Sequence, residues 1–206
     1  MPRAFAIVPA AGHSVRMGQP KLLMPLAGRP LIEHTLEAWR QGGMDRIVVV
    51  VRPGDSALAA AIRSLAVANI DVVQPPSDPP DMKASVQAAL QHIADRYTPA
   101  SDDVFLVAPA DIPRLSSQII SQLVSESIQR PGKIVVPTVG GRRGHPVLFP
   151  WTLAESIYAL PAAEGLSVVV DRGPTDRVAC DLLARGSQQP FADIDTPEEY
   201  RRQTGE

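Results

Sequence analysis

Residues 7–21 read Ile7-Val8-Pro9-Ala10-Ala11-Gly12-His13-Ser14-Val15-Arg16-Met17-Gly18-Gln19-Pro20-Lys21, and this stretch decides the fold. The apolar run 4–8 predicts a short buried strand. The strand then breaks into small residues and two glycines, which let backbone N–H groups form a concavity for anions. Arg16 and Lys21 add positive charge beside it. The stretch predicts a phosphate-binding loop, although an ordinary strand-to-helix loop with solvated cations explains the composition equally well.

The spacing of the glycines excludes two common phosphate loops. Gly12 and Gly18 are six positions apart and Gln19 follows the second, whereas a Walker A loop requires G-x-x-x-x-G-K-[ST]. Residues 12–17 also lack the G-x-G-x-x-G fingerprint of dinucleotide-binding folds. Any phosphate loop here is therefore of another kind.

Outward from this loop, strand patterns alternate with helical patterns along the chain. Apolar or β-branched runs predict strands at 47–51, 70–73, 104–108, 134–136, 146–149, 177–179 and 191–193. Helical spacing of apolar residues predicts helices at 30–41, 56–66, 86–97, 151–160 and 165–170, one capped by Ser116 or Ser117, and one starting near Pro197. This alternation indicates an α/β fold whose mainly parallel sheet is covered by helices on both faces. We expect a single domain over residues 1–206, because no repeat or long linker divides the chain.

The bulk composition excludes several classes of protein. The 206 residues are 45% hydrophobic and 20% charged, with a net charge of -2, so the basic bias of a nucleic-acid binder is missing. No apolar run approaches the length of a membrane span. The one cysteine, Cys180, forms no intrachain disulfide and is expected to be a small buried hydrophobe, which fits a cytoplasmic protein.

A carboxylate follows the strand predicted at 104–108, in the segment Pro109-Ala110-Asp111-Ile112-Pro113. Because ligands of such sheets lie beyond the carboxyl ends of the strands, Asp111 is expected at the same edge as the phosphate loop. Mg²⁺ prefers one or two carboxylates together with phosphate oxygens and water. A turn residue that binds its own backbone would occupy the same position, and the residues alone leave both readings open.

Two further segments contain charged groups beside turn signals. In the segment 193–200, Thr196, Pro197 and Glu199 match a helix start with a capping box, which leaves Asp193 and Asp195 unexplained. The segment 140–149 is a glycine-rich basic loop before a strand, and a solvated hairpin tip explains it without any function.

Four segments together resemble the MobA-like nucleotidyltransferases, most closely the molybdenum cofactor cytidylyltransferase branch. They are A-A-G-x-S-x-R-M-G-x-x-K-L-L at 10–23, P-x-D-x-P at 109–113, G-x-x-G-H-P-V-L-F at 141–149 and D-x-D-T-P-E-[DE]-Y at 193–200. The resemblance covers nearly the whole chain. It implies the three-layer, Rossmann-like fold of the nucleotide-diphosphosugar transferases.

The resemblance also implies roles for individual residues. Those expected to bind the nucleotide are Pro9, Ala10, Ala11, Gly12, Ser14, Arg16, Lys21 and Ser85. Arg16, Lys21 and Asp111 are the expected catalytic residues, and Asp111 and Asp195 the expected Mg²⁺ ligands, with Asp193 assisting or structural. Facing the second substrate are Arg142, Arg143, Gly144 and His145, of which His145 either orients the loop or acts as a base.

The activity implied by the resemblance is Mg²⁺-dependent transfer of CMP from CTP to a molybdopterin-type molybdenum cofactor. Pyrophosphate is released, and a molybdenum hydroxylase is a possible recipient. The pair Ala10-Ala11 favours CTP, where two glycines would favour GTP. A phosphate nucleophile is already ionised at neutral pH, so no strong base is required. Three alternatives stay open: GTP as donor, a sugar or alditol phosphate as acceptor, and a non-catalytic chaperone that holds the cofactor.

Two positions depart from the family pattern. Asp81 replaces the glycine of a G-M-x-x-S element, although Met82 and Ser85 match it. A negative charge near a nucleotide is unfavourable unless it is paired, and Lys83 is the expected partner. Pro9 stands where the branch often has leucine, whereas related isoprenoid cytidylyltransferases also read Pro-Ala-Ala-Gly.

Overall fold

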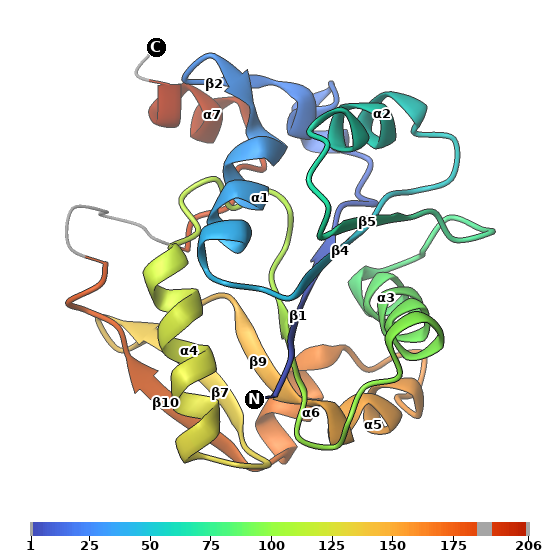
Figure 1. Ribbon diagram of the computed structural model, residues 1–206. Helices are drawn as coiled ribbons and strands as arrows, with labels where there is room; N and C mark the ends of the chain where they lie inside the picture. Colours follow the sequence, from blue (N-terminus) through green and yellow to red (C-terminus); the bar gives the residue numbers. More distant parts are fainter. Residues whose placement is uncertain (1, 185–190, 205–206) are drawn as a thin grey trace.

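The computed structural model describes residues 2–184 and 191–204 (Figure 1). Its main sheet has the strand order β10-β7-β9-β6-β1-β4-β5, with β8 paired to β7. The strands are β1 Ala4–Pro9, β4 Arg46–Val50, β5 Ile70–Val73, β6 Val104–Val107, β7 Ile134–Val139, β8 Arg142–Arg143, β9 Val147–Pro150 and β10 Thr175–Ala179. A separate two-stranded ribbon joins β2 Pro25–Leu26 to β3 Arg29–Pro30.

The sheet is mainly parallel, as the alternation of strands and helices predicts. β5, β4, β1 and β6 run parallel to one another, and β10 runs parallel to β7. β9 lies between β6 and β7 and is antiparallel to both. The carboxyl ends of β1, β4 and β6 therefore meet at one edge, and the loops that follow them lie side by side.

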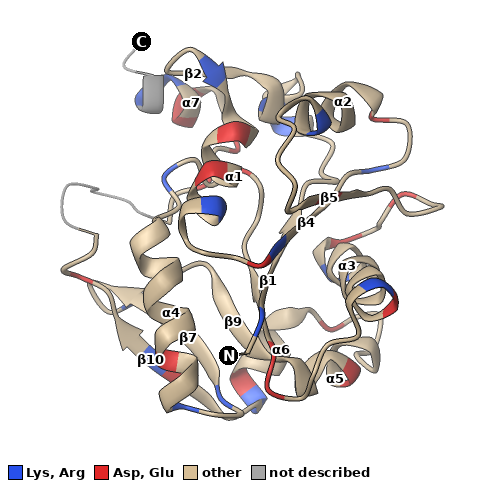
Figure 2. Cartoon of the chain, in the orientation of Figure 1, with Lys and Arg blue, Asp and Glu red and all other residues tan. Residues whose placement is uncertain are grey.

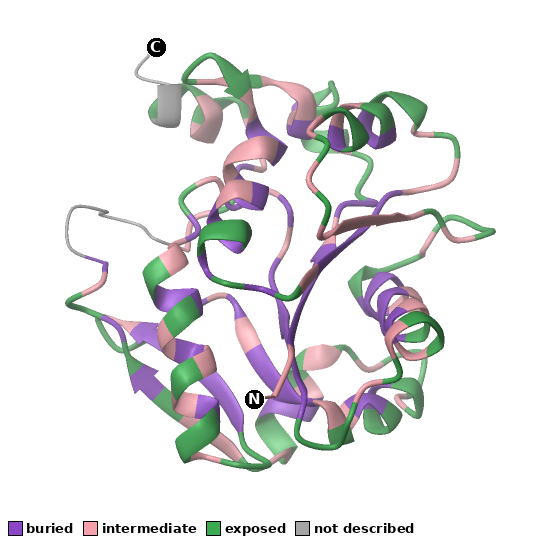
Figure 3. Ribbon diagram, viewed as in Figure 1, coloured by how far each residue is buried: buried purple, intermediate pink, exposed green. Residues whose placement is uncertain are grey.

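Helices cover both faces of the sheet and give the three layers of the expected fold (Figure 1). On one face lie α1 Leu31–Gln41, α2 Ser56–Ser64 and α4 Ser117–Gln129; on the other lie α3 Met82–Tyr97, α5 Ala154–Tyr158 and α6 Leu166–Arg172. Side chains alternate along a strand, so Ala6 and Val8 of β1 pack toward α1 while Phe5 and Ile7 pack toward α3. Figure 3 shows the resulting buried sheet between helices that are buried on one side only.

Helix starts follow the capping signals of the sequence. The Ser116 hydroxyl accepts a hydrogen bond from the Ile119 N–H at 3.3 Å, so Ser116 rather than Ser117 caps α4. The last helix, α7 Pro197–Thr204, begins at the expected proline. Its capping box is present as well, because Glu199 N donates to the Thr196 hydroxyl and the Glu199 carboxylate accepts from Thr196 N.

Several expected elements differ from the structure. The strand expected at 191–193 is wrong: this segment is irregular, and just after it Ile194 N donates to Asp111 O in the loop after β6. The helix expected at 151–160 is shorter, because a 3₁₀ turn, Trp151–Leu153, precedes α5. β7 continues through Pro137 to Val139 instead of stopping at 136, and β9 begins at Val147, one residue after Pro146.

Charged residues of both signs are interspersed over the elements in Figure 2 rather than gathered into a basic stripe. No helix within residues 2–184 and 191–204 is long and apolar enough to cross a membrane. Cys180 is buried, and burial raises the pKa of its thiol, as expected for a small hydrophobe rather than a nucleophile.

Candidate active site

The loop after β1 is anchored to the sheet and then folded into two tight turns. Ala10 N donates to Val50 O at 2.8 Å, which continues the pairing of β1 with β4. Left-handed backbone occurs at Gly18, with φ +69°, and at Ser14, with φ +52°, rather than at Gly12. The Ser14 hydroxyl accepts from Lys21 N at 3.3 Å. These contacts fix the direction in which the Lys21 side chain leaves the loop.

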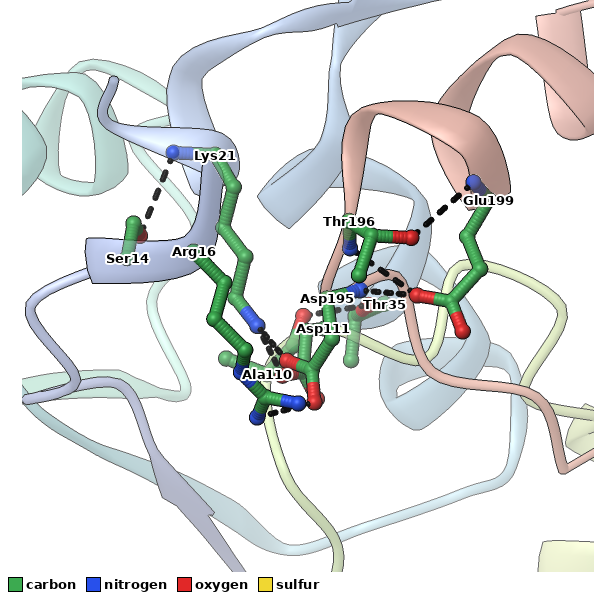
Figure 4. Close-up of polar contacts among 9 residues, drawn as sticks. All are labelled: Ser14, Arg16, Lys21, Thr35, Ala110, Asp111, Asp195, Thr196 and Glu199. Carbon is green, nitrogen blue, oxygen red and sulfur yellow. Dashed lines mark hydrogen bonds and ion pairs between the residues drawn. The ribbon is translucent and has the colours of Figure 1, made fainter. Parts of the chain in front are cut away.

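The Lys21 ammonium lies between two carboxylates (Figure 4). Its Nζ is 2.5 Å from Asp111 Oδ2 and 2.6 Å from Asp195 Oδ1. The Lys21 side chain is 11% exposed, whereas Arg16, which contacts Asp195 at 2.6 Å, is 70% exposed. Arg16 is therefore a solvated cation that is available to a ligand, and Lys21 is a fixed one.

The charges of this cluster stabilise one another. Burial alone would lower the pKa of Lys21, but its ion pairs with Asp111 and Asp195 raise it. Burial opposes ionisation of Asp195, yet hydrogen bonds from Lys21 and Arg16 lower its pKa below the ordinary range. By contrast, partial burial and the neighbouring carboxylates of Asp111 and Asp195 raise the pKa of Asp193. Lys21 and Asp195 are thus both charged at neutral pH.

Asp111 is held by three elements that are distant in sequence. The hydroxyl of buried Thr35 on α1 lies 2.9 Å from Ala110 O and 3.2 Å from Ile112 O. Ala110 N donates to Pro9 O, and Ile194 N donates to Asp111 O, both at 3.1 Å. The second carboxylate oxygen, Asp111 Oδ1, is buried and accepts no hydrogen bond from the described residues. Such an oxygen leaves an acceptor that a cation could contact.

Asp195 is oriented by the start of α7 (Figure 4). The Glu199 carboxylate accepts from Asp195 N at 2.8 Å and from Thr196 N at 2.9 Å. The capping box explains Thr196 and Glu199 structurally, as the sequence suggested. It also holds the backbone of Asp195, so the cap and the candidate metal ligand form one rigid unit.

A cavity of about 420 Å³ is lined by all the residues that were expected to bind the nucleotide or to be Mg²⁺ ligands. Its lining includes Pro9, Ala10, Ala11, Gly12, Ser14, Arg16, Lys21, Ser85, Asp111 and Asp195. Residues that sequence reasoning missed also line it, among them His13, Pro79 and Pro80. His13 Nε2 lies 2.6 Å from Asp78 Oδ2 and thereby joins the phosphate loop to the proline-rich loop. No local pattern in the sequence indicates this contact between residues 65 positions apart.

A second cavity of about 470 Å³ lies beside the first and shares Asp81 and Met82 with it. Of the residues assigned to the second substrate, Arg143, Gly144 and His145 line this cavity, while Arg142 is exposed on β8 outside its described lining. Burial lowers the pKa of His145, so its imidazole is neutral near pH 7. Much of the remaining lining is apolar, from Val107, Val136, Val147, Phe149, Leu166 and Val170.

The expected pairing of Asp81 with Lys83 is wrong. Asp81 is the N-cap of α3, and its carboxylate accepts from Ala84 N at 2.7 Å. Its φ of −152° is extended backbone that any residue adopts, so the fold does not require glycine here. Lys83 points instead to backbone carbonyls at 161–164. The N-terminus of α3 therefore stabilises the negative charge of Asp81.

Gly144 joins the second cavity to the segment that carries Asp195. Gly144 N donates to Pro137 O at 2.9 Å, and a Cβ at Gly144 would lie 2.1 Å from the Phe191 ring. We therefore expect Gly144→Ala to lower the free energy of unfolding by about 1–3 kcal/mol, because the ring or the loop has to move. Urea denaturation measures the change.

The matched control for this prediction is Gly165→Ala, whose Cβ meets nothing within 4 Å. The Phe191→Ala variant lacks the clashing ring. We therefore expect Gly144→Ala to lower the free energy of unfolding by less in the Phe191→Ala background than in the wild-type protein. Equal stability of Gly144→Ala and the wild-type protein would contradict the close packing of Gly144 against Phe191.

Comparisons with known proteins find similar sequences and similar structures. The family model of the MobA-like NTP transferase domain matches residues 6–178. The 2-C-methyl-D-erythritol 4-phosphate cytidylyltransferase of Ralstonia nicotianae is 33% identical over 177 residues, which are 83% of this chain and 64% of that protein. The chain thus spans less than two thirds of that relative's length.

Solved structures share the fold over almost the whole chain. Rv0371c from Mycobacterium tuberculosis superposes with a TM-score of 0.78 at 25% identity, covering 100% of this chain and 98% of that chain. Its complex with manganese gives a TM-score of 0.75 at 24% identity, covering 98% of both chains. The molybdopterin-guanine dinucleotide biosynthesis protein A of Archaeoglobus fulgidus gives 0.70 at 20% identity, covering 98% of this chain and 97% of that one.

Proposed function

The chain belongs to the MobA-like NTP transferase family, and from that premise we propose that it transfers CMP from CTP to a phosphorylated acceptor. One observation carries the proposal: Lys21, Asp111 and Asp195 meet in a cavity that shares Asp81 and Met82 with a second, more apolar cavity. The first cavity suits a triphosphate, since the loop 10–21 and Arg16 offer positive charge. The second has room for an acceptor beside it. The cytidylyltransferase relative supports CTP as the donor.

The proposed reaction is a displacement at the α-phosphorus of CTP. A phosphate oxygen of the acceptor forms a bond to that phosphorus, the bond to the bridging oxygen breaks, and pyrophosphate leaves. The attacking oxygen is already ionised, which explains why the site needs no strong base. Arg16 and Lys21 neutralise charge on the triphosphate, and the loop 9–14 orients it. Neutral His145 orients the acceptor loop.

Asp111 and Asp195 fit a divalent cation that accompanies the nucleotide. A single cationic group, the Lys21 ammonium, already contacts both carboxylates, so they converge on one position. The buried Asp111 Oδ1 adds an oxygen that has no donor among the described residues. Mg²⁺ prefers one or two carboxylates together with phosphate oxygens and water, and this pair of carboxylates fits that preference. When bound, Mg²⁺ supplies charge neutralisation on the triphosphate. The manganese complex of Rv0371c supports a divalent cation in this fold.

The acceptor we propose is a molybdopterin-type molybdenum cofactor. The apolar lining from Val136, Phe149 and Leu166 suits the flat body of a pterin. Arg143 is available for its phosphate, because its partner Asp171, at 2.6 Å, is an exposed carboxylate. The product would pass to a molybdenum hydroxylase. We also propose that residues 1–206 form one domain.

A second acceptor, 2-C-methyl-D-erythritol 4-phosphate, is favoured by the similarity to the 2-C-methyl-D-erythritol 4-phosphate cytidylyltransferase of Ralstonia nicotianae. The Pro9-Ala10-Ala11-Gly12 start of the loop also resembles isoprenoid cytidylyltransferases. A polyol phosphate gains less from an apolar cavity than a pterin does, so we rank it second.

Pyrophosphate release tests these proposals directly. The protein is incubated with Mg²⁺, one of CTP or GTP, and either molybdenum cofactor or 2-C-methyl-D-erythritol 4-phosphate. We expect CTP to be preferred over GTP by about 100-fold in kcat/KM, with the molybdenum cofactor as acceptor. Preference for GTP overturns the donor, and preference for the polyol phosphate overturns the acceptor. Nucleotide binding by calorimetry without turnover on any acceptor would identify a non-catalytic binding protein instead.

A further inference from the structure

Lys83 is a buried lysine outside the charged cluster of the first cavity. It is 7% exposed and lies in the first turn of α3. Its Nζ donates to three backbone carbonyls, Pro161 O at 2.7 Å, Ala162 O at 3.0 Å and Glu164 O at 2.9 Å. A lysine ammonium has three donors, so these contacts satisfy all of them.

Two of the three carbonyls, those of Ala162 and Glu164, belong to residues that line the second cavity, and Pro161 lies next to them in the chain. The segment 161–165 connects α5 to α6, and the wall lining includes Ala162, Ala163, Glu164 and Gly165. This segment has no helix or strand of its own. Its other hydrogen bonds reach only nearby residues: Glu164 N donates to Pro161 O, Gly165 O accepts from Val168 N, and the Glu164 carboxylate pairs with the exposed Arg172 at 3.0 Å. Among the hydrogen bonds of the described residues, those from Lys83 thus tie this segment to a distant part of the chain.

The other end of this link lies at the junction of the two cavities. Asp81 and Met82, which immediately precede Lys83, line both cavities, whereas Lys83 itself lines only the second. A buried ammonium is costly to desolvate, and charge-assisted hydrogen bonds compensate only while the three carbonyls stay in place. The contact therefore holds the wall at a fixed distance from the start of α3.

We propose that Lys83 is a positioning residue that sets the acceptor cavity by holding the segment 161–165. The role of the second cavity in acceptor binding rests on the proposed function. The anchoring of the segment 161–165 by Lys83 (the hold) does not depend on it. Lys83 touches neither the triphosphate loop nor the aspartates, so its removal affects acceptor binding and spares the nucleotide. If Lys83 only stabilised the fold, replacing it would not raise the KM of one substrate selectively.

The test compares Lys83→Met with Lys133→Met, a control at an exposed lysine. In Lys83→Met we expect amide hydrogen exchange at 162–166 to accelerate about tenfold, because the segment loses its anchor. With whichever of molybdenum cofactor and 2-C-methyl-D-erythritol 4-phosphate the wild-type protein uses, the acceptor KM rises about tenfold. We expect the KM for CTP and the exchange of the loop 10–21 to remain unchanged. Lys83→Arg retains charged donors and is expected to recover most of both effects.

Each outcome bears on one step of the proposal. Unchanged exchange at 162–166 in Lys83→Met overturns the hold. Faster exchange with an unchanged acceptor KM overturns the role in acceptor binding. Faster exchange in a protein that is inactive on both acceptors refutes the proposed function but supports the hold. If Lys83→Met does not fold, Ala163→Gly loosens the same segment from its own side, and an unchanged acceptor KM in that variant overturns the proposal.

Discussion

Replacing Asp111 with asparagine is expected to lower kcat/KM for nucleotidyl transfer by about 1,000-fold, which is about 4 kcal/mol of transition-state stabilisation. Asparagine keeps the shape of the side chain but removes the negative charge that the proposed Mg²⁺ and Lys21 both contact at Asp111. The fold is expected to survive, because Thr35 and Ile194 contact the backbone of residues 110–112 and not this carboxylate. Pyrophosphate release measures the rate, and thermal unfolding measures the fold.

Asp102→Asn is the matched control for Asp111→Asn. Asp102 is exposed and lies before β6, at the opposite end of the strand from Asp111. We expect this variant to retain wild-type turnover and unfolding temperature. An Asp111→Asn protein that turns over at the wild-type rate would exclude Asp111 from the metal site.

Replacing Lys21 with methionine is expected to have two opposite effects. Turnover falls by about 1,000-fold, because the fixed cation of the triphosphate site is lost. The affinity of the nucleotide-free protein for Mn²⁺ rises by about tenfold, because the ammonium no longer neutralises the Asp111 and Asp195 carboxylates that it contacts at 2.5 and 2.6 Å. Calorimetric titration with Mn²⁺ and pyrophosphate release measure the two effects separately.

Lys133→Met serves as the control for Lys21→Met and is expected to change neither quantity. Lys21→Arg keeps the charge, so its Mn²⁺ affinity is expected to stay near that of the wild-type protein. Weaker Mn²⁺ binding in Lys21→Met would contradict a metal position between the two aspartates.

The sequence predicts the sheet edge well, because its signals there are local. The strand at 104–108 and the segment after it are enough to put Asp111 on the edge that carries the phosphate loop, by the rule for parallel strands. The capping box of α7 is likewise predicted by Thr196, Pro197 and Glu199. The roles of the site residues remain predictions, but their gathering into one cavity follows from topology together with the resemblance.

Contacts between residues distant in sequence, and contacts of irregular segments, leave no local pattern from which they could be predicted. Lys21 was expected on the triphosphate alone, and nothing near it in the chain predicts that it bridges two aspartates. The pairing of Asp81 with Lys83 fails because residues two apart at a helix start do not face each other. The segment 161–165 has no helical or strand pattern of residues. Its hydrogen bonds to Lys83 therefore cannot be predicted from the sequence and are found only in the structure.

The ion pair between Lys21 and Asp195 joins residues 174 positions apart, and this has a consequence for biosynthesis. At about 5–20 residues per second, a ribosome reaches Asp195 roughly 10 to 35 seconds after Lys21. During that interval the nascent chain has the phosphate loop and later Asp111, but it lacks the carboxylate that completes the cluster. A nascent chain that has not yet reached Asp195 would therefore lack part of the proposed site, and a polypeptide truncated before Asp195 is expected to lack the proposed activity.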